Sequence, residues 1–180
     1  DTRGYAGAVL AGQGQDQAVG HRNALGGWRS LCQHRAMRFF FYGTLQAGNL
    51  NPAIAAIHGR LIPQGPGRIK GTLVAVPDDD GWFPALVPGD GEVHGQVYAA
   101  GPDFTEADLA ALDRYEEFDP ASPESSWYLR ETRTLINGEP VTVYRMNGSP
   151  PADASPIPGG DFRAWLAAAG LPEFHGRGDA

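Results

Sequence analysis

The chain has 180 residues and a mass of 19.2 kDa, which suits one ordinary domain. Hydrophobic residues make up 42% of it and the formal net charge is −7, so the composition predicts a folded domain and argues against nucleic acid as a partner. No apolar run approaches the length that a membrane span needs. The single Cys32 excludes an internal disulfide and a cysteine-based metal site. We therefore expect a soluble, cytoplasmic protein.

Residues 1–36 differ in kind from the rest of the chain. They are rich in glycine, lack sustained alternation or helical periodicity, and end just before the first methionine, Met37. We predict that residues 37–180 form the domain and that residues 1–36 are a disordered or non-native leader. A short segment packed at the periphery of the domain is the alternative.

Six segments have the apolar alternation or the aromatic and β-branched content of strands. They span residues 38–42, 68–76, 83–87, 93–98, 127–136 and 140–147. The last two flank Asn137-Gly138-Glu139, which predicts a hairpin turn. Helices are predicted over residues 50–58, 105–117 and 160–169, the second with Thr105 as its N-cap. Because strands outnumber helices and lie close together along the chain, the expected class is α+β with a curled or closed sheet.

One acidic residue of the second predicted helix stands out by its position. At about 100° per residue, Glu116 falls between Leu109 and Leu112 on the apolar stripe. Asp113 and Glu117 fall progressively off that stripe. A carboxylate in apolar surroundings has a raised pKa, as a group that must both accept and donate a proton requires. The alternative is a carboxylate at a fraying helix end that is hydrogen-bonded by backbone amides and has a structural role only.

A second feature is the junction Tyr42-Gly43-Thr44-Leu45, where the first predicted strand ends. Gly43 lets the backbone turn sharply, and consecutive amides in such a turn can converge on an anion. A small carboxylate would fit there. The alternative is an ordinary turn at the end of a strand, where glycine is common.

The other polar residues form no comparable pattern. His58 and His94 are isolated, and we expect them to be structural or surface histidines. No spacing matches a metal site, and Asp78-Asp79-Asp80 lacks the alternating ligands of a calcium loop. No serine has the signature of a nucleophile elbow.

Five segments taken in chain order form a series. They are Phe40-Phe41-Tyr42-Gly43-Thr44-Leu45, Trp82-Phe83-Pro84-Ala85-Leu86-Val87-Pro88-Gly89, Val93-His94-Gly95-Gln96-Val97-Tyr98, Leu112-Asp113-Arg114-Tyr115-Glu116 and Trp127-Tyr128-Leu129-Arg130. Together they resemble the gamma-glutamylcyclotransferase-like (AIG2-like) family over about residues 37–148. One block alone is weak, whereas five in the family's order are specific to the fold.

The resemblance implies an α+β fold, a small mixed β-barrel with flanking helices, that uses no metal or organic cofactor. It further implies that the turn from Tyr42 to Leu45 binds the α-carboxylate of the substrate and that Glu116 is the acid/base. Two departures are present. Glu117 stands where the family often has glycine, so a second carboxylate competes for the role, and Gln46 stands where a basic residue often follows the turn.

The expected function is cyclisation of a γ-glutamyl compound to 5-oxoproline with release of the attached amine. Glu116 would transfer the proton, and Tyr128 or a turn amide would donate to the developing oxyanion. The alternative is a small-molecule binding or interaction module on the same fold, without turnover. A core-facing Glu116 favours the enzyme, because burying an uncompensated acid is unfavourable. The sequence leaves the released amine and the oligomeric state open.

Overall fold

The computed structural model describes residues 37–48 and 51–174, so the predicted leader lies outside the described residues. The strands are β1 (Arg38–Phe41), β2 (Leu61–Asp78), β3 (Gly81–Ala100), β4 (Tyr128–Thr134), β5 (Pro140–Met146) and β6 (Ser155–Pro156). The helices are α2 (Pro52–His58), α3 (Glu106–Tyr115) and α4 (Phe162–Ala169), with a short 3-10 turn η1 (Pro123–Ser125). Every predicted helix is present, and the predicted hairpin is β4–β5.

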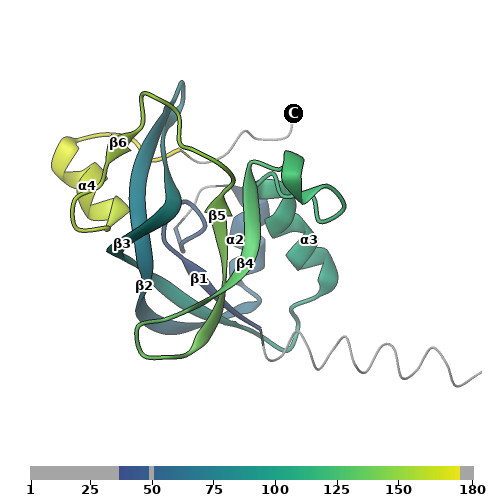
Figure 1. Ribbon diagram of the computed structural model, residues 1–180. Coiled ribbons are helices and arrows are strands. Elements are labelled where there is room, and N and C mark those ends of the chain that lie inside the picture. The colour runs from purple at the N-terminus through teal and green to yellow at the C-terminus, as the bar shows by residue number, and fades with distance from the viewer. Residues whose placement is uncertain (1–36, 49–50, 175–180) are drawn as a thin grey trace, which may run out of the picture.

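All six strands belong to one mixed sheet in the order β4-β5-β1-β3-β2-β6. The pairing of β1 with β5 is parallel, and the other pairings are antiparallel. The sheet curls, and an isolated bridge between Ile69 of β2 and Leu135, the residue after β4, joins its two sides. The N–H of Ile136 donates to the Arg68 carbonyl at 2.9 Å beside this bridge. The fold is therefore α+β, a half-barrel with three helices in the described part of the chain (Figure 1).

The separate strands predicted over residues 83–87 and 93–98 are one long strand, β3, so that prediction is wrong. The segment between them is rich in glycine and proline, which are weak strand formers. Residues 88–91 of this segment have no partner on β2, but β3 pairs with β2 on both sides of them, Val87 with Thr72 and Glu92 with Lys70. The register shifts here, between Lys70 and Thr72, and again between Pro63 and Gly65. Pairing on both sides therefore keeps the chain extended across this irregularity.

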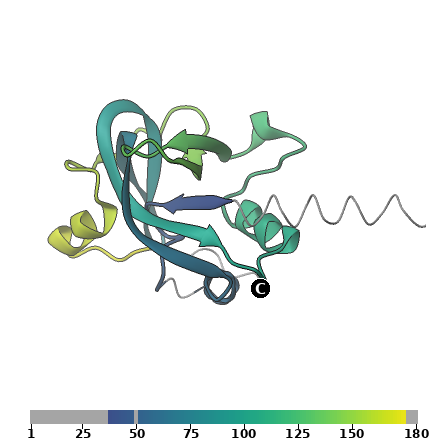
Figure 2. The same ribbon diagram turned by 90° about the horizontal axis from the view of Figure 1, so that it is seen from below.

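Two apolar clusters pack on the two faces of the sheet, as the alternation of β1 requires. Phe39 and Phe41 pack in one cluster with residues of α2 and α3. Phe40 and Tyr42 pack in the other with residues of α4. Both views show α4 on one side of the sheet and α3 on the opposite side (Figure 1; Figure 2).

Helix α3 begins where the sequence predicts and ends earlier. Thr105 is its N-cap, and it forms a capping box with Asp108, in which each side chain accepts a hydrogen bond from the other residue's N–H. The last helical residue is Tyr115, and Glu116 is the C-cap. Glu117 then adopts a positive φ of 50°, which ends the helix.

Candidate active site

The carboxyl group of Glu116 lies half-buried at the C-terminal end of α3. Burial raises the pKa of this carboxyl from 4.5 to about 8, and the negative charge of Glu117 adds to the rise. The backbone N–H of Glu116 donates to the Leu112 carbonyl at 3.1 Å, so the backbone that carries this carboxyl group is fixed to the last turn of the helix. Glu117 is exposed. The structure thus gives the perturbed environment to Glu116 rather than to its neighbour.

Three buried tyrosines lie within electrostatic reach of Glu116. Burial raises the pKa values of Tyr42, Tyr128 and Tyr144, and the charge of Glu116 contributes to the rise in each. Tyr42 is the first residue of the strand-turn junction, and Tyr128 is the first residue of β4. The structure therefore brings together three of the residues singled out in the sequence, Tyr42, Glu116 and Tyr128.

Each of these phenols donates its hydrogen bond within the protein. The Tyr42 hydroxyl donates to the Tyr144 carbonyl at 2.6 Å, and the Tyr128 hydroxyl donates to the Pro84 carbonyl at 3.0 Å. A phenol has one hydrogen to donate. Tyr128 can therefore act as an oxyanion donor only if it gives up the bond to Pro84.

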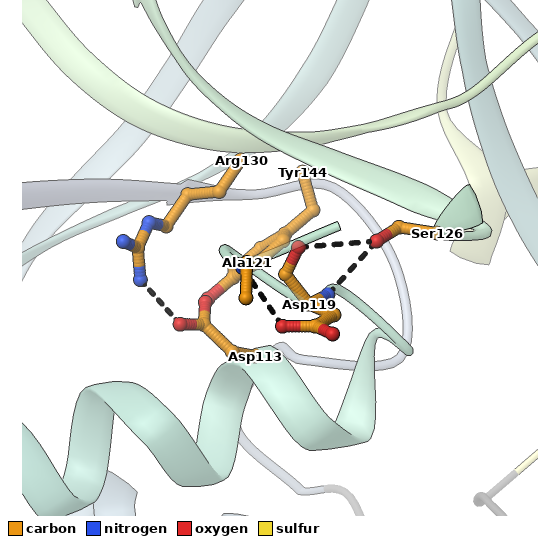
Figure 3. A network of polar contacts seen from close by, with 6 residues as sticks. All are labelled: Asp113, Asp119, Ala121, Ser126, Arg130 and Tyr144. Carbon is orange, nitrogen blue, oxygen red and sulfur yellow. Dashed lines mark hydrogen bonds and ion pairs between the residues drawn. The ribbon is translucent and has the colours of Figure 1, made fainter. Parts of the chain in front are cut away.

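A network of polar contacts ties α3 to the hairpin (Figure 3). The Asp113 carboxylate accepts from the Tyr144 hydroxyl at 2.7 Å and from Arg130 Nη1 at 2.5 Å. Asp113 is only 6% exposed, so the prediction that it falls off the apolar stripe is wrong. The physical reason is that the two partners compensate the buried charge. Because Asp113 lies one turn before Glu116, the network fixes the end of the helix against β4 and β5.

The loop between α3 and β4 is also held by internal hydrogen bonds. The N–H of Asp119 donates to the Ser126 hydroxyl at 2.8 Å, and the N–H of Ala121 donates to the Asp119 carboxylate at 2.8 Å (Figure 3). The N–H of Trp127 donates to the Glu117 carbonyl at 3.2 Å. The backbone on both sides of Glu116 is therefore fixed.

The predicted anion-binding turn, Tyr42 to Leu45 with Gln46 after it, is buried throughout. The N–H of Gln46 donates to the Gly43 carbonyl at 2.9 Å and closes the turn. Gly43 does not have a positive φ, so the left-handed backbone region is not the reason for a glycine here. The reason is close approach, because an added Cβ would lie 2.1 Å from Pro84 Cγ. Any larger residue must displace Pro84, the residue whose carbonyl holds Tyr128.

A groove of about 620 Å³ opens on another part of the sheet surface. Its lining includes Arg68, His94 and Gln96, and it shares Gln46 with the turn, but it does not include Glu116, Tyr42 or Tyr128. We place the candidate site at Glu116, because the perturbed acid and the buried tyrosines meet there. In the described part of the chain, no group of three or more His, Cys, Asp and Glu residues could hold a metal, and no helix is long and apolar enough to cross a membrane.

The fold and this site define a small α+β half-barrel with a carboxyl group at its rim. A family model described as gamma-glutamyl cyclotransferase, AIG2-like, matches residues 39–164. The chain belongs to this family. A search of curated proteins gives no match.

Solved structures with the same fold come from distant organisms. An uncharacterized protein of Pyrococcus horikoshii is 18% identical, with a TM-score of 0.53, and the match covers 75% of this chain and 97% of that one. A uropathogenic Escherichia coli-specific protein is 19% identical, with a TM-score of 0.55 and coverage of 73% and 95%. Allophanate hydrolase of Kluyveromyces lactis is 15% identical, with a TM-score of 0.55, and the match covers 74% of this chain but 21% of that enzyme. At these identities the likeness shows the fold alone.

Proposed function

We propose that this chain is a gamma-glutamylcyclotransferase that converts a γ-glutamyl compound into 5-oxoproline and a free amine. The observation that carries the proposal is the carboxyl group of Glu116, half-buried at the end of α3 with a pKa of about 8. A pKa near neutrality suits a group that takes a proton and returns it in one catalytic cycle. Membership of the family supports the reaction class.

The reaction is an intramolecular aminolysis. The α-amine nitrogen attacks the γ-carbonyl carbon, a new C–N bond closes the five-membered ring, and the original bond to the leaving nitrogen breaks. Glu116 takes one proton from the attacking nitrogen to free the amine and a second as the ring closes, and it passes both to the leaving nitrogen, which departs as an ammonium, so no water is consumed. The substrate arrives as an ammonium, whose positive charge next to Glu116 lowers the pKa of that carboxyl and favours the ionised form that acts as base.

Folding the substrate is the main task of the protein, because both reacting groups belong to one molecule. We propose that the amides of the turn from Gly43 to Leu45 hold the α-carboxylate. Tyr128 is already bonded to Pro84. The oxyanion on the γ-carbonyl is therefore assigned to a turn amide.

The test is a panel of γ-glutamyl compounds that differ in the released amine: an amino acid, a dipeptide, the ε-amine of lysine and a polyamine. Wild-type protein should form 5-oxoproline, measured by mass spectrometry, from at least one of them, and Glu116→Gln should form none. Binding of a panel member without 5-oxoproline formation would instead support the non-catalytic binding module. Equal turnover by wild type and Glu116→Gln would refute the proposed role of this residue.

A further inference from the structure

Three side chains from three elements hold the turn that follows β1. His58 Nε2, at the end of α2, lies 2.7 Å from the Leu45 carbonyl oxygen. Arg163 Nη1, in α4, donates to the Ala47 carbonyl at 3.0 Å. The N–H of Ala47 donates to the Tyr98 hydroxyl at 3.3 Å. The turn is therefore fixed by side chains from α2, β3 and α4.

His58 orients two peptide planes of the turn, the first directly and the second through a hydrogen bond. A carbonyl only accepts, so His58 Nε2 carries the hydrogen of this bond. In a trans peptide the C=O and the following N–H point in opposite directions, so the bond to Leu45 also fixes the N–H of Gln46. That N–H donates to the Gly43 carbonyl at 2.9 Å, which in turn fixes the peptide between Gly43 and Thr44.

The imidazole of His58 is itself held in place. It packs edge-on against Phe41 and Tyr98, with ring centroids 6.1 Å and 5.1 Å away. Burial lowers the pKa of His58, the bond to Leu45 raises it, and the charge of Arg163 lowers it further. At neutral pH the ring is thus an uncharged donor of fixed orientation.

Arg163 brings a positive charge to a turn that has none of its own. Residues 42–48 contain no basic side chain. The hydrogen bond from Arg163 Nη1 to the Ala47 carbonyl places the guanidinium against the turn. Its ion-pair partner Glu173 lies 3.7 Å from Nη2, and within residues 37–48 and 51–174 neither Arg163 Nε nor Glu173 Oε1 has a hydrogen-bond partner. The positive charge is therefore only loosely neutralised.

On the basis of the proposed function, we propose that His58 and Arg163 are positioning residues for the α-carboxylate of the substrate. His58 orients the turn amides, and Arg163 supplies the positive charge next to them. The turn would then select a ligand whose carboxylate is ionised, either a γ-glutamyl group or 5-oxoproline.

The test compares two probes that share a ring, 5-oxoproline and its neutral amide, 5-oxoprolinamide, by calorimetry or ligand-observed NMR. Arg163→Gln and His58→Leu should each weaken 5-oxoproline binding about tenfold while changing amide binding less than about twofold. Arg163→Lys and His58→Gln should retain most of the affinity, because the charge and the donor are kept. Arg68→Gln is the matched control, since Arg68 is an exposed arginine paired with Glu92.

If Arg163→Gln prefers the acid to the amide as strongly as wild type does, the inference is overturned. If a thermal melt shows that His58→Leu is unfolded, Arg163→Gln alone decides. Loss of affinity in Arg68→Gln with none in Arg163→Gln would also overturn it and would place the ligand in the groove lined by Arg68. Wild-type protein that binds neither probe would refute the proposed function itself, and the inference with it.

Discussion

The two ends of α3 hold their acidic side chains in opposite environments. At the start, burial raises the pKa of Asp108, but hydrogen bonds from Thr105 and the charge of Arg60 outweigh it, so the pKa falls below its usual value. At the end, burial raises the pKa of Glu116 to about 8, and Glu117 raises it further. The helix dipole acts in the same sense, because it stabilises an anion at the N-terminus and disfavours one at the C-terminus.

Asp113 adds a third case on the same helix. It is buried like Asp108, and Tyr144 and Arg130 occupy both of its oxygens. The two buried acids, Asp108 and Asp113, are each bonded to an arginine and a hydroxyl group, whereas Glu116 is half-buried at the end of the helix. An acid whose oxygens are both bonded has a structural role, and Glu116, whose pKa burial raises to about 8, is the one suited to proton transfer.

Replacing Glu116 should have the largest effect. Glu116→Gln keeps the shape of the side chain but cannot carry a proton, so turnover should fall by about 10² to 10⁴. The far-ultraviolet circular dichroism spectrum should not change. Asp108→Asn at the other end of α3 is the control, and it should reduce stability with little effect on kcat. If kcat falls equally in both variants, the contrast between the two ends is wrong.

Breaking the Asp113 network should have the largest effect on stability. Asp113→Ala leaves the half-buried Arg130 and the buried Tyr144 without their partner and should lower the free energy of unfolding by about 3 kcal/mol. Asp113→Asn keeps an acceptor for Tyr144 and should cost less. Urea denaturation measures both, and a loss below about 1 kcal/mol in Asp113→Ala would show that the network contributes little.

The stability of the protein should depend on Glu116 in the neutral pH range. Its pKa is 4.5 in the unfolded chain and about 8 in the folded one, so between these values the folded state holds a proton that the unfolded state has lost. The free energy of unfolding should therefore fall as pH rises from about 4.5 to 8 and level off above. For a half-buried group we expect a change of at most about 3 kcal/mol.

Glu116→Gln should remove this part of the pH dependence and be relatively more stable than wild type at pH 8 to 9. Urea midpoints of the two proteins across pH 5 to 9 measure the effect. Parallel curves would mean that Glu116 does not have the raised pKa.

Much of the fold follows from local signals in the sequence. The capping residue Thr105, the hairpin turn at Asn137-Gly138 and the glycine that ends the last helix act within a few residues, and all are present. The continuous β3 was not predictable in this way, because its middle, residues 88–91, is extended between two stretches that pair with β2. Helical phase singled out Glu116, the carboxyl whose pKa burial raises to about 8.

The position of Asp113 around the helix did not predict its burial, because that burial depends on partners from two strands, β4 and β5. Arg130, within the block Trp127 to Arg130, was the available signal, since an arginine in a strand that packs against the core favours an acid as its partner. His58 looked isolated because its partner is a backbone carbonyl, which leaves no pattern in the sequence. Contacts between a side chain and a distant backbone are the part of the site that sequence reasoning cannot supply.

The smallest expected effect comes from Glu117, the neighbour that shares the end of α3. Its charge is the second cause of the raised pKa of Glu116, after burial. Glu117→Gln should therefore lower the pKa of Glu116 and shift the acidic limb of the kcat/KM profile toward lower pH by a few tenths of a unit, with the maximum rate nearly unchanged. Glutamine keeps the length of the side chain at the positive φ of 50°, so the backbone is disturbed little.

The profile is measured by 5-oxoproline formation between pH 5.5 and 9.5. A large loss of maximum rate, with Glu116→Gln still active, would assign the proton transfer to Glu117. A shift toward higher pH would mean that Glu117 stabilises the ionised form of its neighbour, and the electrostatic account of this end of the helix would then be wrong.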